Sequence, residues 1–212
     1  MRQGKGKDRI ENMALAIHDL GKSYGGVPVF RHVELLLEEG GVYCLRAPSG
    51  AGKTTLLRIL MGLERPDEGW VEGLKGRQVS AVFQEDRLCP ALNAAENIRL
   101  ANPGCSREAL HRELLELLWE DSLAKPISTF SGGMRRRVSL LRALLSPGEL
   151  LLFDEPFNGL DDQSRQAAVD YVKKKRNGRT LLFTTHHPEE AEALRARCVI
   201  WEESLKTWRL AR

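Results

Sequence analysis

Apolar and polar residues follow two different rhythms along this sequence, and each rhythm predicts a different kind of element. Alternating residues or short apolar runs, which are typical of β-strands, occur five times in the first part of the chain. These predicted strands cover residues 13–24, 32–40, 41–47, 69–73 and 79–84. A helix over residues 52–62 follows the third strand, and Gly62 marks its end. Its expected buried face consists of Leu56, Ile59, Leu60 and Leu63.

From residue 85 onwards, apolar residues recur with the spacing of helices. Residues 106–119 predict an amphipathic helix with Ser106 as its N-cap. Its apolar stripe is formed by Leu110, Leu114, Leu117 and Leu118. Together with a helix that begins near Ser131, this stretch predicts a helical insert over about residues 85–145.

The last third of the chain returns to strands that alternate with helices. Two short apolar runs, residues 149–156 and 179–187, predict buried parallel strands, and a helix over residues 163–178 lies between them. Residues 198–210 predict a hairpin. Alternation of this kind predicts an α/β fold with a mainly parallel sheet.

Composition narrows the class of protein. The 212 residues suffice for one sizeable domain, and we expect a single domain over residues 1–212 with a loose basic tail over residues 1–12. A net charge of +3 does not indicate the concentrated basic face of a nucleic-acid-binding protein. The four cysteines form no C-x-x-C pair, which argues against a zinc site or disulfide framework and fits a reducing cytoplasm. No apolar run approaches the roughly 20 residues of a membrane span, so a membrane role would need a partner chain.

The stretch "APSGAGKTTLL" resembles a phosphate-binding loop, G-x-x-x-x-G-K-[ST], with Ala47 in place of the first glycine. Such a loop directs backbone N–H groups and a helix N-terminus at phosphate oxygens, while Lys53 reaches the β- and γ-phosphates and the Thr54 hydroxyl binds Mg²⁺. The alternative is a glycine-rich turn that caps a helix, but the strand–loop–helix context favours nucleotide binding. Ala47 is tolerated if its φ is negative. The expected nucleotide-binding residues here are Ala47, Pro48, Ser49, Gly50, Ala51, Gly52, Lys53, Thr54 and Thr55.

Two carboxylates end the predicted strand over residues 149–156. Asp154 can complete the Mg²⁺ shell, and Glu155 can polarise a water molecule in line with the γ-phosphate. A surface acidic pair is the alternative, and the phosphate loop makes it the weaker one.

Further motifs resemble the ATP-binding cassette (ABC) family, and the resemblance covers about residues 14–200. We name the segment Phe130-Ser131-Gly132-Gly133-Met134 the signature segment, because it matches the family's L-S-G-G-Q motif. Gly159-Leu160-Asp161 matches the family's D-loop. Single residues match the switch histidine, the Q-loop glutamine and the adenine-stacking aromatic residue, and these are His186, Gln84 and Tyr24.

The resemblance implies a P-loop NTPase core with an N-terminal antiparallel β part and a helical insert subdomain. It implies catalytic roles for Glu155, His186 and Gln84, and Mg²⁺ contacts from Thr54, Gln84 and Asp154. Ser131, Gly132 and Gly133 open a helix, which offers a hydroxyl, free N–H groups and a positive dipole end to an anion. In isolation this is an ordinary N-cap. The resemblance implies a head-to-tail homodimer, in which the signature segment of one chain closes over the ATP bound by its partner. It also implies that Asp161, in the D-loop, contributes to this dimer.

Some residues depart from the family pattern or carry other interpretations. Phe130, Met134 and His187 differ from the commoner residues, and Met134 resembles the nitrate, sulfonate and taurine importer branch. A metal site formed by His186 and His187 with nearby glutamates is disfavoured, because adjacent residues at a strand end point in opposite directions. The basic clusters 135–137 and 173–176 are interpreted as solvated helix surface rather than nucleic-acid contacts.

The sequence therefore predicts an ATPase subunit, with ATP and Mg²⁺, that powers a membrane transporter, which we expect to be an importer. Its expected partners are permease subunits and an extracytoplasmic solute-binding protein, without nucleic acid, and its expected place is the cytoplasmic face of the membrane. Two alternatives are an ABC-type ATPase that acts on DNA or ribosomes, and a nucleotide-dependent regulator that does not hydrolyse ATP. The absence of heptads and of a second motif set opposes the first, and Glu155 opposes the second.

Overall fold

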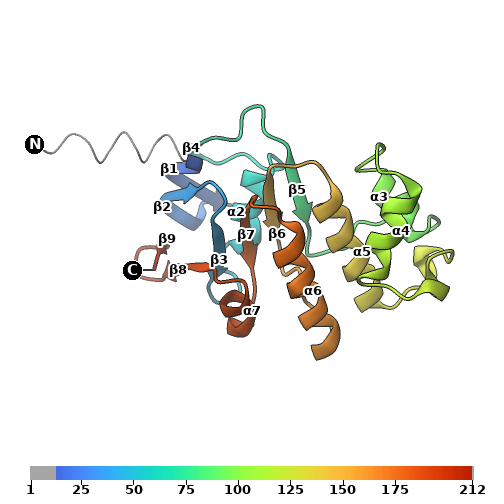
Figure 1. Cartoon of the computed structure of the whole chain (residues 1–212). Helices are drawn as coiled ribbons and strands as arrows, with labels where there is room; N and C mark the ends of the chain where they lie inside the picture. The colour runs from blue at the N-terminus through green and yellow to red at the C-terminus, as the bar shows by residue number, and fades with distance from the viewer. Residues whose placement is uncertain (1–12, 212) are drawn as a thin grey trace, which may run out of the picture.

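A computed structural model of the chain describes residues 13–211. The predicted tail over residues 1–12 lies outside this range. Two sheets and a set of helices make up the described part (Figure 1).

The smaller sheet is antiparallel and has the strand order β2-β1-β4. It consists of β1 (Met13–Tyr24), β2 (Val27–Glu38) and β4 (Glu68–Glu72). Gly25 and Gly26 join β1 to β2 with φ values of 56° and 80°. Two consecutive positive φ values are what a two-residue hairpin of type I′ requires, so glycine suits both positions. This sheet confirms the antiparallel β part, and its second strand begins five residues before the predicted residue 32.

The larger sheet has the order β5-β6-β7-β3-β8-β9. Its strands are β3 (Val42–Arg46), β5 (Val79–Val82), β6 (Leu150–Phe153), β7 (Thr180–Thr184), β8 (Arg197–Glu202) and β9 (Thr207–Leu210). All neighbouring pairs are parallel except β8 and β9, which form the predicted hairpin. Every residue of β6 and β7 is buried, as expected for central strands of a parallel sheet that is covered on both faces.

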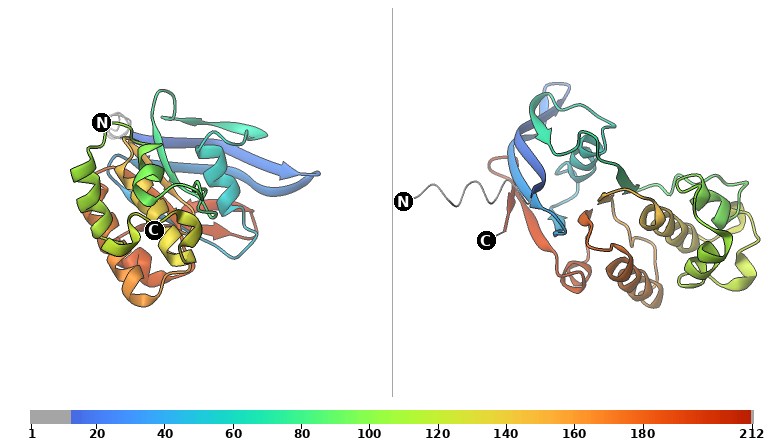
Figure 2. Two further views of the ribbon diagram at one scale, coloured as in Figure 1. Left: turned by 90° about the vertical axis from the view of Figure 1, so that its right-hand side faces the viewer. Right: turned by 45° about the horizontal axis from the view of Figure 1, so that its top comes forward.

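The helices are divided between this sheet and one end of the molecule. They are α2 (Lys53–Leu60), α3 (Ala94–Arg99), α4 (Arg107–Leu115), α5 (Gly132–Leu145), α6 (Asp162–Lys175) and α7 (Pro188–Ala193), with 3₁₀ turns at Glu120–Ser122 and Ile127–Thr129. Figures 1 and 2 show α3 and α4 at the end opposite to β1 and β2. The insert of residues 85–145 therefore contains the helices that were predicted, while its independence as a subdomain stays a prediction.

Alternate residues of the central strands face two different hydrophobic cores. Leu150 and Leu152 of β6 pack in the core that contains α2 and the small sheet. Leu151 and Phe153 pack in the core that contains α3 to α6. The parallel sheet thus joins the phosphate-loop helix on one face to the helical insert on the other.

Two local predictions need correction, and one helix was not predicted. Leu63 was placed on the buried face of α2, but it is 48% exposed, because the helix ends at Leu60 and Gly62 with φ 71° turns the chain outward. The N–H of Leu63 donates to the carbonyl of Arg58, a helix-terminating bond of the Schellman type. The helix predicted over residues 106–119 ends at Leu115, although its leucine stripe is buried. Helix α7 was not predicted.

Candidate active site

The predicted chemical groups meet where β3, β6 and β7 end at their carboxyl edge, the usual place for ligands in an open α/β sheet. The strands end earlier than predicted, at Arg46, Phe153 and Thr184, so the functional residues lie on the loops that follow. A cleft of about 430 Å³ opens there. It is lined by Tyr24, Val29, Ser49, Gly50, Gly52, Lys53, Thr54, Thr55, Gln84, Glu155 and His186.

Two glycines shape the phosphate loop between β3 and α2. Gly50 and Gly52 have φ values of 86° and 83°, in the left-handed region that favours glycine. A Cβ atom at Gly52 would lie 2.5 Å from the Val29 Cγ1 atom, so this position has no space for a side chain. Ala47 is not among the residues of the described chain with positive φ. Its replacement of the family's glycine therefore imposes no backbone strain.

Lys53 is buried at the first turn of α2, and its Nζ atom donates to the carbonyls of Ala47 at 2.9 Å and Pro48 at 3.1 Å. Burial lowers the pKa of the Lys53 ammonium, while the carboxylates of Glu155 and Asp154 act in the opposite direction. The two hydrogen bonds show that the Lys53 side chain folds back onto the loop, where the phosphates of a nucleotide would bind.

Asp154 connects the phosphate loop to β7. Its Oδ2 atom accepts a hydrogen bond from the Thr54 hydroxyl at 2.7 Å, and its Oδ1 atom accepts one from the Thr184 hydroxyl at 2.8 Å. Mg²⁺ prefers oxygen ligands, and the Thr54 hydroxyl and the Asp154 carboxylate place two such oxygens in contact. At a nucleotide site, phosphate oxygens and water commonly complete the coordination of the ion. The residues present therefore fit a Mg²⁺ ion that is bound together with a nucleotide.

Glu155 lies beside Asp154 in an unusual backbone conformation, with φ 47°. Its N–H donates to the Thr184 hydroxyl at 2.8 Å, so one threonine contacts both acidic residues. The Glu155 Oε1 atom lies 3.0 Å from His186 Nε2, and its Oε2 atom accepts from Asn158 Nδ2 at 3.1 Å. Left-handed backbone at a non-glycine residue is costly and concentrates at functional sites. The carboxylate is thus oriented from two sides.

Sequence reasoning missed Thr184 and Asn158 as supporting residues. Both stand next to residues that the sequence singled out, because Thr184 is two residues before His186 and Asn158 directly precedes Gly159 of the D-loop. The Thr184 contacts depend on how β6 and β7 pair, which spacing does not reveal, whereas the Asn158 contact is local and depends on the turn that the chain makes after Glu155.

Gln84 follows β5 and lines two adjoining hollows. One is the main cleft, and the other is a smaller hollow of about 70 Å³ that Thr54 and Asp154 also line. The structure therefore brings together the residues that were predicted to contact Mg²⁺.

Tyr24 lies at the end of β1 and lines the cleft. Its ring is half exposed, at 51%, and its hydroxyl donates to Glu64. An exposed ring at the edge of a phosphate-loop cleft is accessible to a nucleotide base, which agrees with the predicted stacking role.

The signature segment lies away from this cleft. Ser131 caps α5 by accepting from the Met134 N–H at 3.2 Å, and a Cβ atom at Gly133 would lie 3.3 Å from the carbonyl of Gly159. None of the residues Ser131, Gly132, Gly133 and Asp161 lines the cleft. Each chain therefore has a second exposed helix N-terminus, which does not face its own phosphate loop.

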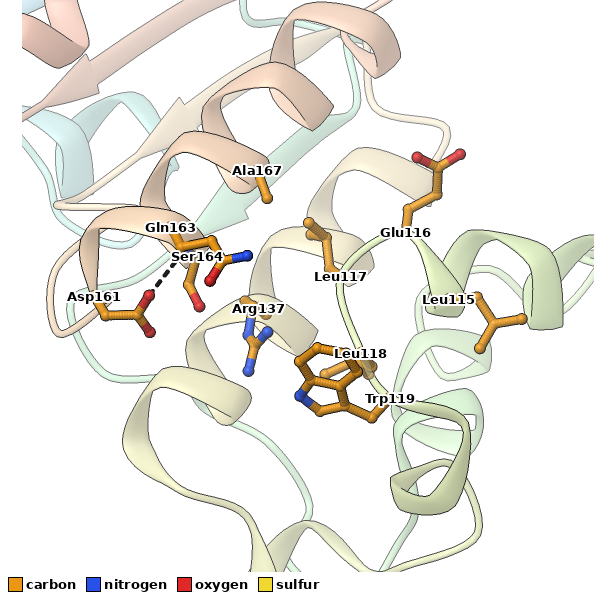
Figure 3. A pocket seen from close by; sticks show the side chains of 10 residues that line it. All are labelled: Leu115, Glu116, Leu117, Leu118, Trp119, Arg137, Asp161, Gln163, Ser164 and Ala167. Atoms are coloured by element: carbon orange, nitrogen blue, oxygen red, sulfur yellow. Dashed lines mark hydrogen bonds between the residues drawn. The ribbon is translucent and has the colours of Figure 1, made fainter.

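Asp161 caps α6 by accepting from the Ser164 N–H at 2.9 Å, and this bond lowers the pKa of its carboxyl. It lines a separate cavity of about 470 Å³ between α5, α6 and the chain after α4 (Figure 3). In the view of Figure 3, Arg137 lies between Asp161 and the exposed Trp119.

The interpretation of residues 135–137 as solvated helix surface is wrong for Arg136. Its side chain is buried, and it binds carbonyls of the chain that follows β5. The physical reason is that α5 packs against this chain, so successive residues of the cluster face different surroundings. In the second cluster, Lys173 and Lys174 are exposed, whereas Lys175 is partly buried and forms an ion pair with Glu113.

The side chains of the two histidines after β7 contact different glutamates. His186 faces Glu155, whereas His187 Nδ1 lies 3.0 Å from Glu189 Oε1 on the helix that follows. Within residues 13–211 no group of three or more His, Cys, Asp or Glu side chains is arranged to hold a metal ion. Glu190 is buried and accepts from the Thr185 hydroxyl, and burial raises the pKa of its carboxyl.

Fold and cleft together define a nucleotide-binding α/β protein of the phosphate-loop class. A family model described as "ABC transporter" matches residues 30–158. Because this match covers more than half of the sequence, the chain belongs to the ABC transporter ATP-binding family. The recognition made from the motifs is confirmed, and so is the fold class.

Two curated relatives illustrate the similarity. The chain is 35% identical over 211 residues to the spermidine/putrescine import ATP-binding protein PotA of Mesoplasma florum, which covers 92% of this chain and 60% of that protein. It is 39% identical over 198 residues to the aliphatic sulfonates import ATP-binding protein SsuB 1 of Rhodococcus jostii, which covers 89% of this chain and 79% of the relative. The chain thus spans about three fifths of the length of the first relative. The importer branch suggested by Met134 is represented among the relatives.

Solved structures show the same fold. A structure titled "Structure of ATP binding subunit of ABC transporter" has a TM-score of 0.80 and 27% identity, and covers 92% of this chain and 88% of that chain. A dimeric post-hydrolysis state of the ATP-binding cassette MJ0796 bound to ADP and Pi has a TM-score of 0.78 and 25% identity, with 93% and 97% covered. Within the described residues, no helix has the length and hydrophobicity that a bilayer crossing requires.

Proposed function

We propose that this protein binds ATP with Mg²⁺ and hydrolyses it to power solute transport, most simply import, through partner membrane subunits. The observation that carries the proposal is the pair of Glu155 and His186, whose side chains meet at 3.0 Å on the wall of the phosphate-loop cleft.

The chain's own residues divide the chemistry between them. The loop N–H groups and Lys53 bind the phosphates, and Tyr24 stacks on the base. Thr54, Asp154 and Gln84 would hold Mg²⁺, which would supply positive charge to stabilise the β- and γ-phosphates. Glu155 accepts a proton from the attacking water molecule. His186 orients the Glu155 carboxylate and contacts the γ-phosphate.

The active form in this proposal is a head-to-tail homodimer. Ser131, Gly132 and Gly133 of one chain bind the ATP that the partner's phosphate loop holds, and Asp161 lies at the junction between the chains. Two features support this arrangement: the signature segment has an exposed helix N-terminus, and it lies outside its own chain's cleft. The relative structure with ADP and Pi is titled as dimeric.

The transport partners follow from the names of the relatives, which are import ATP-binding proteins. We propose permease subunits as direct partners, a solute-binding protein in the same system, and a peripheral position on the cytoplasmic face of the membrane. The relatives import polyamines, sulfate or sulfonates, so their names do not single out one solute for this chain.

The decisive experiment compares the ATPase activity of wild-type protein with that of Glu155→Gln. The amide keeps the size of the side chain and loses its basicity, so we expect turnover to fall about 10²–10⁴-fold while ATP binding persists. The matched control is Glu189→Gln, which changes an exposed glutamate beside the other histidine and should retain wild-type turnover. Absence of Mg²⁺-dependent ATPase activity in the wild-type protein, with ATP still bound, would instead favour a regulatory nucleotide-binding module.

A further inference from the structure

The segment that follows β5 lies outside the sheet, so no hydrogen bonds to a neighbouring strand hold its backbone in place. Strand β5 ends at Val82, and no regular element follows until α3 begins at Ala94. Gln84 lies in this segment, with an exposed side chain at the cleft. The position of Gln84 must therefore be set by contacts from outside its own segment.

We propose that Arg136 of α5 is the positioning residue for Gln84, and that it couples the signature helix to the Mg²⁺ side of the cleft. This inference rests on the proposed function, because it concerns how Gln84 is presented to the nucleotide and its metal ion.

The contacts of Arg136 are concentrated on this segment. Its Nη1 atom donates to the carbonyl of Phe83 at 2.7 Å, and its Nη2 atom donates to the carbonyl of Gln84 at 2.5 Å. Its Nε atom lies 3.4 Å from Asp86 Oδ1. The residue is only 7% exposed, so these bonds form in surroundings that largely exclude water. Charge-assisted bonds of this kind are stronger than neutral ones.

The shape of the arginine side chain matters for this task. A planar guanidinium presents N–H groups in a rigid fork, which can bind two successive carbonyls and a carboxylate at once. Neither lysine nor glutamine can make the same set of bonds. The fork thus fixes the backbone of Gln84 on both sides of its α-carbon.

Arg136 also lies one helical turn after the signature glycines. Ser131 and Gly132 open α5, so a displacement of this helix end is transmitted to Arg136 as part of one rigid element. Because the signature segment serves the partner's ATP in the proposed dimer, Arg136 connects one nucleotide site to the glutamine of the other.

Two further arginines of α5 contact the segment beyond Gln84. Arg135 Nε lies 3.7 Å from Asp86 Oδ2, and Arg142 donates to the carbonyls of Arg87 at 2.7 Å and Asp86 at 3.1 Å. This ion pair and these two hydrogen bonds hold the segment against α5 when Arg136 is changed. Loss of the Arg136 fork should therefore release Gln84 locally without detaching the whole loop.

The test uses Arg136→Gln and Arg136→Lys in the full chain, with Arg179→Gln as the matched control. Arg179 is also a partly buried arginine that binds several carbonyls, including those of Leu144 and Gly148, but it does not contact the Gln84 segment. The first readout needs no nucleotide: amide hydrogen exchange of residues 83–87 should become about tenfold faster in Arg136→Gln and stay unchanged in Arg179→Gln.

The second readout is the Mg²⁺ dependence of ATP hydrolysis. We expect Arg136→Gln to lower kcat about 10- to 100-fold and to raise the Mg²⁺ concentration at half-maximal rate, with ATP binding in the absence of Mg²⁺ unchanged. Arg179→Gln should lower thermal stability but keep the Mg²⁺ dependence. If Arg136→Gln does not fold, Arg136→Lys provides the same comparison with a smaller effect.

A double-mutant cycle with Gln84→Ala shows whether Arg136 acts through Gln84. If it does, the double variant is no slower than Gln84→Ala, whereas independent effects would multiply. Multiplying effects, or unchanged exchange of residues 83–87, would overturn the inference. A wild-type protein without ATPase activity would contradict the proposed function instead. If the ATPase activity is lost in Glu155→Gln but is normal in Arg136→Gln, only the inference about Arg136 is contradicted.

Discussion

At the residue scale, one buried hydroxyl supports both acidic residues of the cleft. Thr184 Oγ1 donates to Asp154 and accepts the N–H of Glu155, which has a left-handed backbone. Thr184 is fully buried, so water cannot replace these bonds. The geometry of the proposed base therefore depends on a residue that does not itself line the cleft.

We predict that Thr184→Val lowers stability by about 1–3 kcal/mol, because the isosteric side chain leaves the Asp154 Oδ1 atom and the Glu155 N–H unpaired. Turnover should fall as well, since Glu155 loses the bond that fixes its backbone. Urea unfolding and steady-state ATPase measurements test both effects. Thr184→Ser is the control, because it keeps the hydroxyl and should retain most of the activity. Equal losses in the Val and Ser variants would assign the effect to packing.

Two small residues of the phosphate loop should respond in opposite ways to substitution. Ala47 has no positive φ in the structure, so Ala47→Gly should change ATP affinity less than about twofold. Gly52 combines φ 83° with a Cβ position 2.5 Å from Val29, so Gly52→Ala should abolish detectable ATP binding. Equilibrium binding of a fluorescent ATP analogue measures both. A large gain from Ala47→Gly would show that the native loop is impaired.

At the scale of elements, helix α6 is joined to helix α4 by a polar cluster. The Tyr171 hydroxyl donates to Glu113 Oε2 at 2.7 Å, and Lys175 pairs with the same carboxylate. Burial raises the pKa of the Glu113 carboxyl, but the hydrogen bonds from Lys175 and Tyr171 outweigh it, so the pKa lies below the ordinary value of 4.5. The charged carboxylate therefore stabilises the contact between these helices.

A pH series tests this contact. Because the folded-state pKa of Glu113 is lowered, its contribution is complete above the unfolded-state pKa and is lost as pH falls through the folded-state pKa. Glu113→Gln should therefore lower the free energy of unfolding by about 1 kcal/mol at pH 7, and the gap to wild type should narrow below about pH 4.5. The control is Glu116→Gln, whose more exposed ion pair with Lys174 should matter less. A gap that widens on acidification would contradict the lowered pKa.

At the scale of the whole molecule, α2 and α5 each present a helix N-terminus that suits an anion. Only the first has the acidic residues beside it. A twofold, head-to-tail pair would give every nucleotide one of each kind. The two ends should then be separable by mixing variants.

We predict that Ser131→Arg and Lys53→Ala are each nearly inactive, and that mixing them restores part of the ATPase activity. In a mixed dimer both defects fall on one composite site and the other site is intact, so an equal mixture should recover up to about a quarter of wild-type turnover. The control mixture of Lys53→Ala with Glu155→Gln should stay inactive, because these residues act in the same chain and each site keeps one defect. No recovery in the first mixture, with subunit exchange verified, would contradict the dimer.

By itself, the sequence determined the class of this protein. The phosphate loop, the acidic pair and the signature segment are local patterns in which adjacent residues define a turn, a strand end or a helix start, so spacing suffices to predict them. The same is true of most strands and helices, since hydrophobic periodicity reports which face of an element is buried. The exceptions were short or terminal elements such as α7 and the turn at Leu63.

Only the tertiary structure decided how these local pieces meet. The pairing of Glu155 with His186, the role of Thr184 and the burial of Arg136 each join segments that are about 30 to 50 residues apart in the sequence. Such contacts depend on the parallel order of β5, β6 and β7 and on the packing of α5 against the chain after β5. Periodicity records whether a residue is buried, but it carries no information about which distant residue lies opposite, and that is why these contacts could not be predicted.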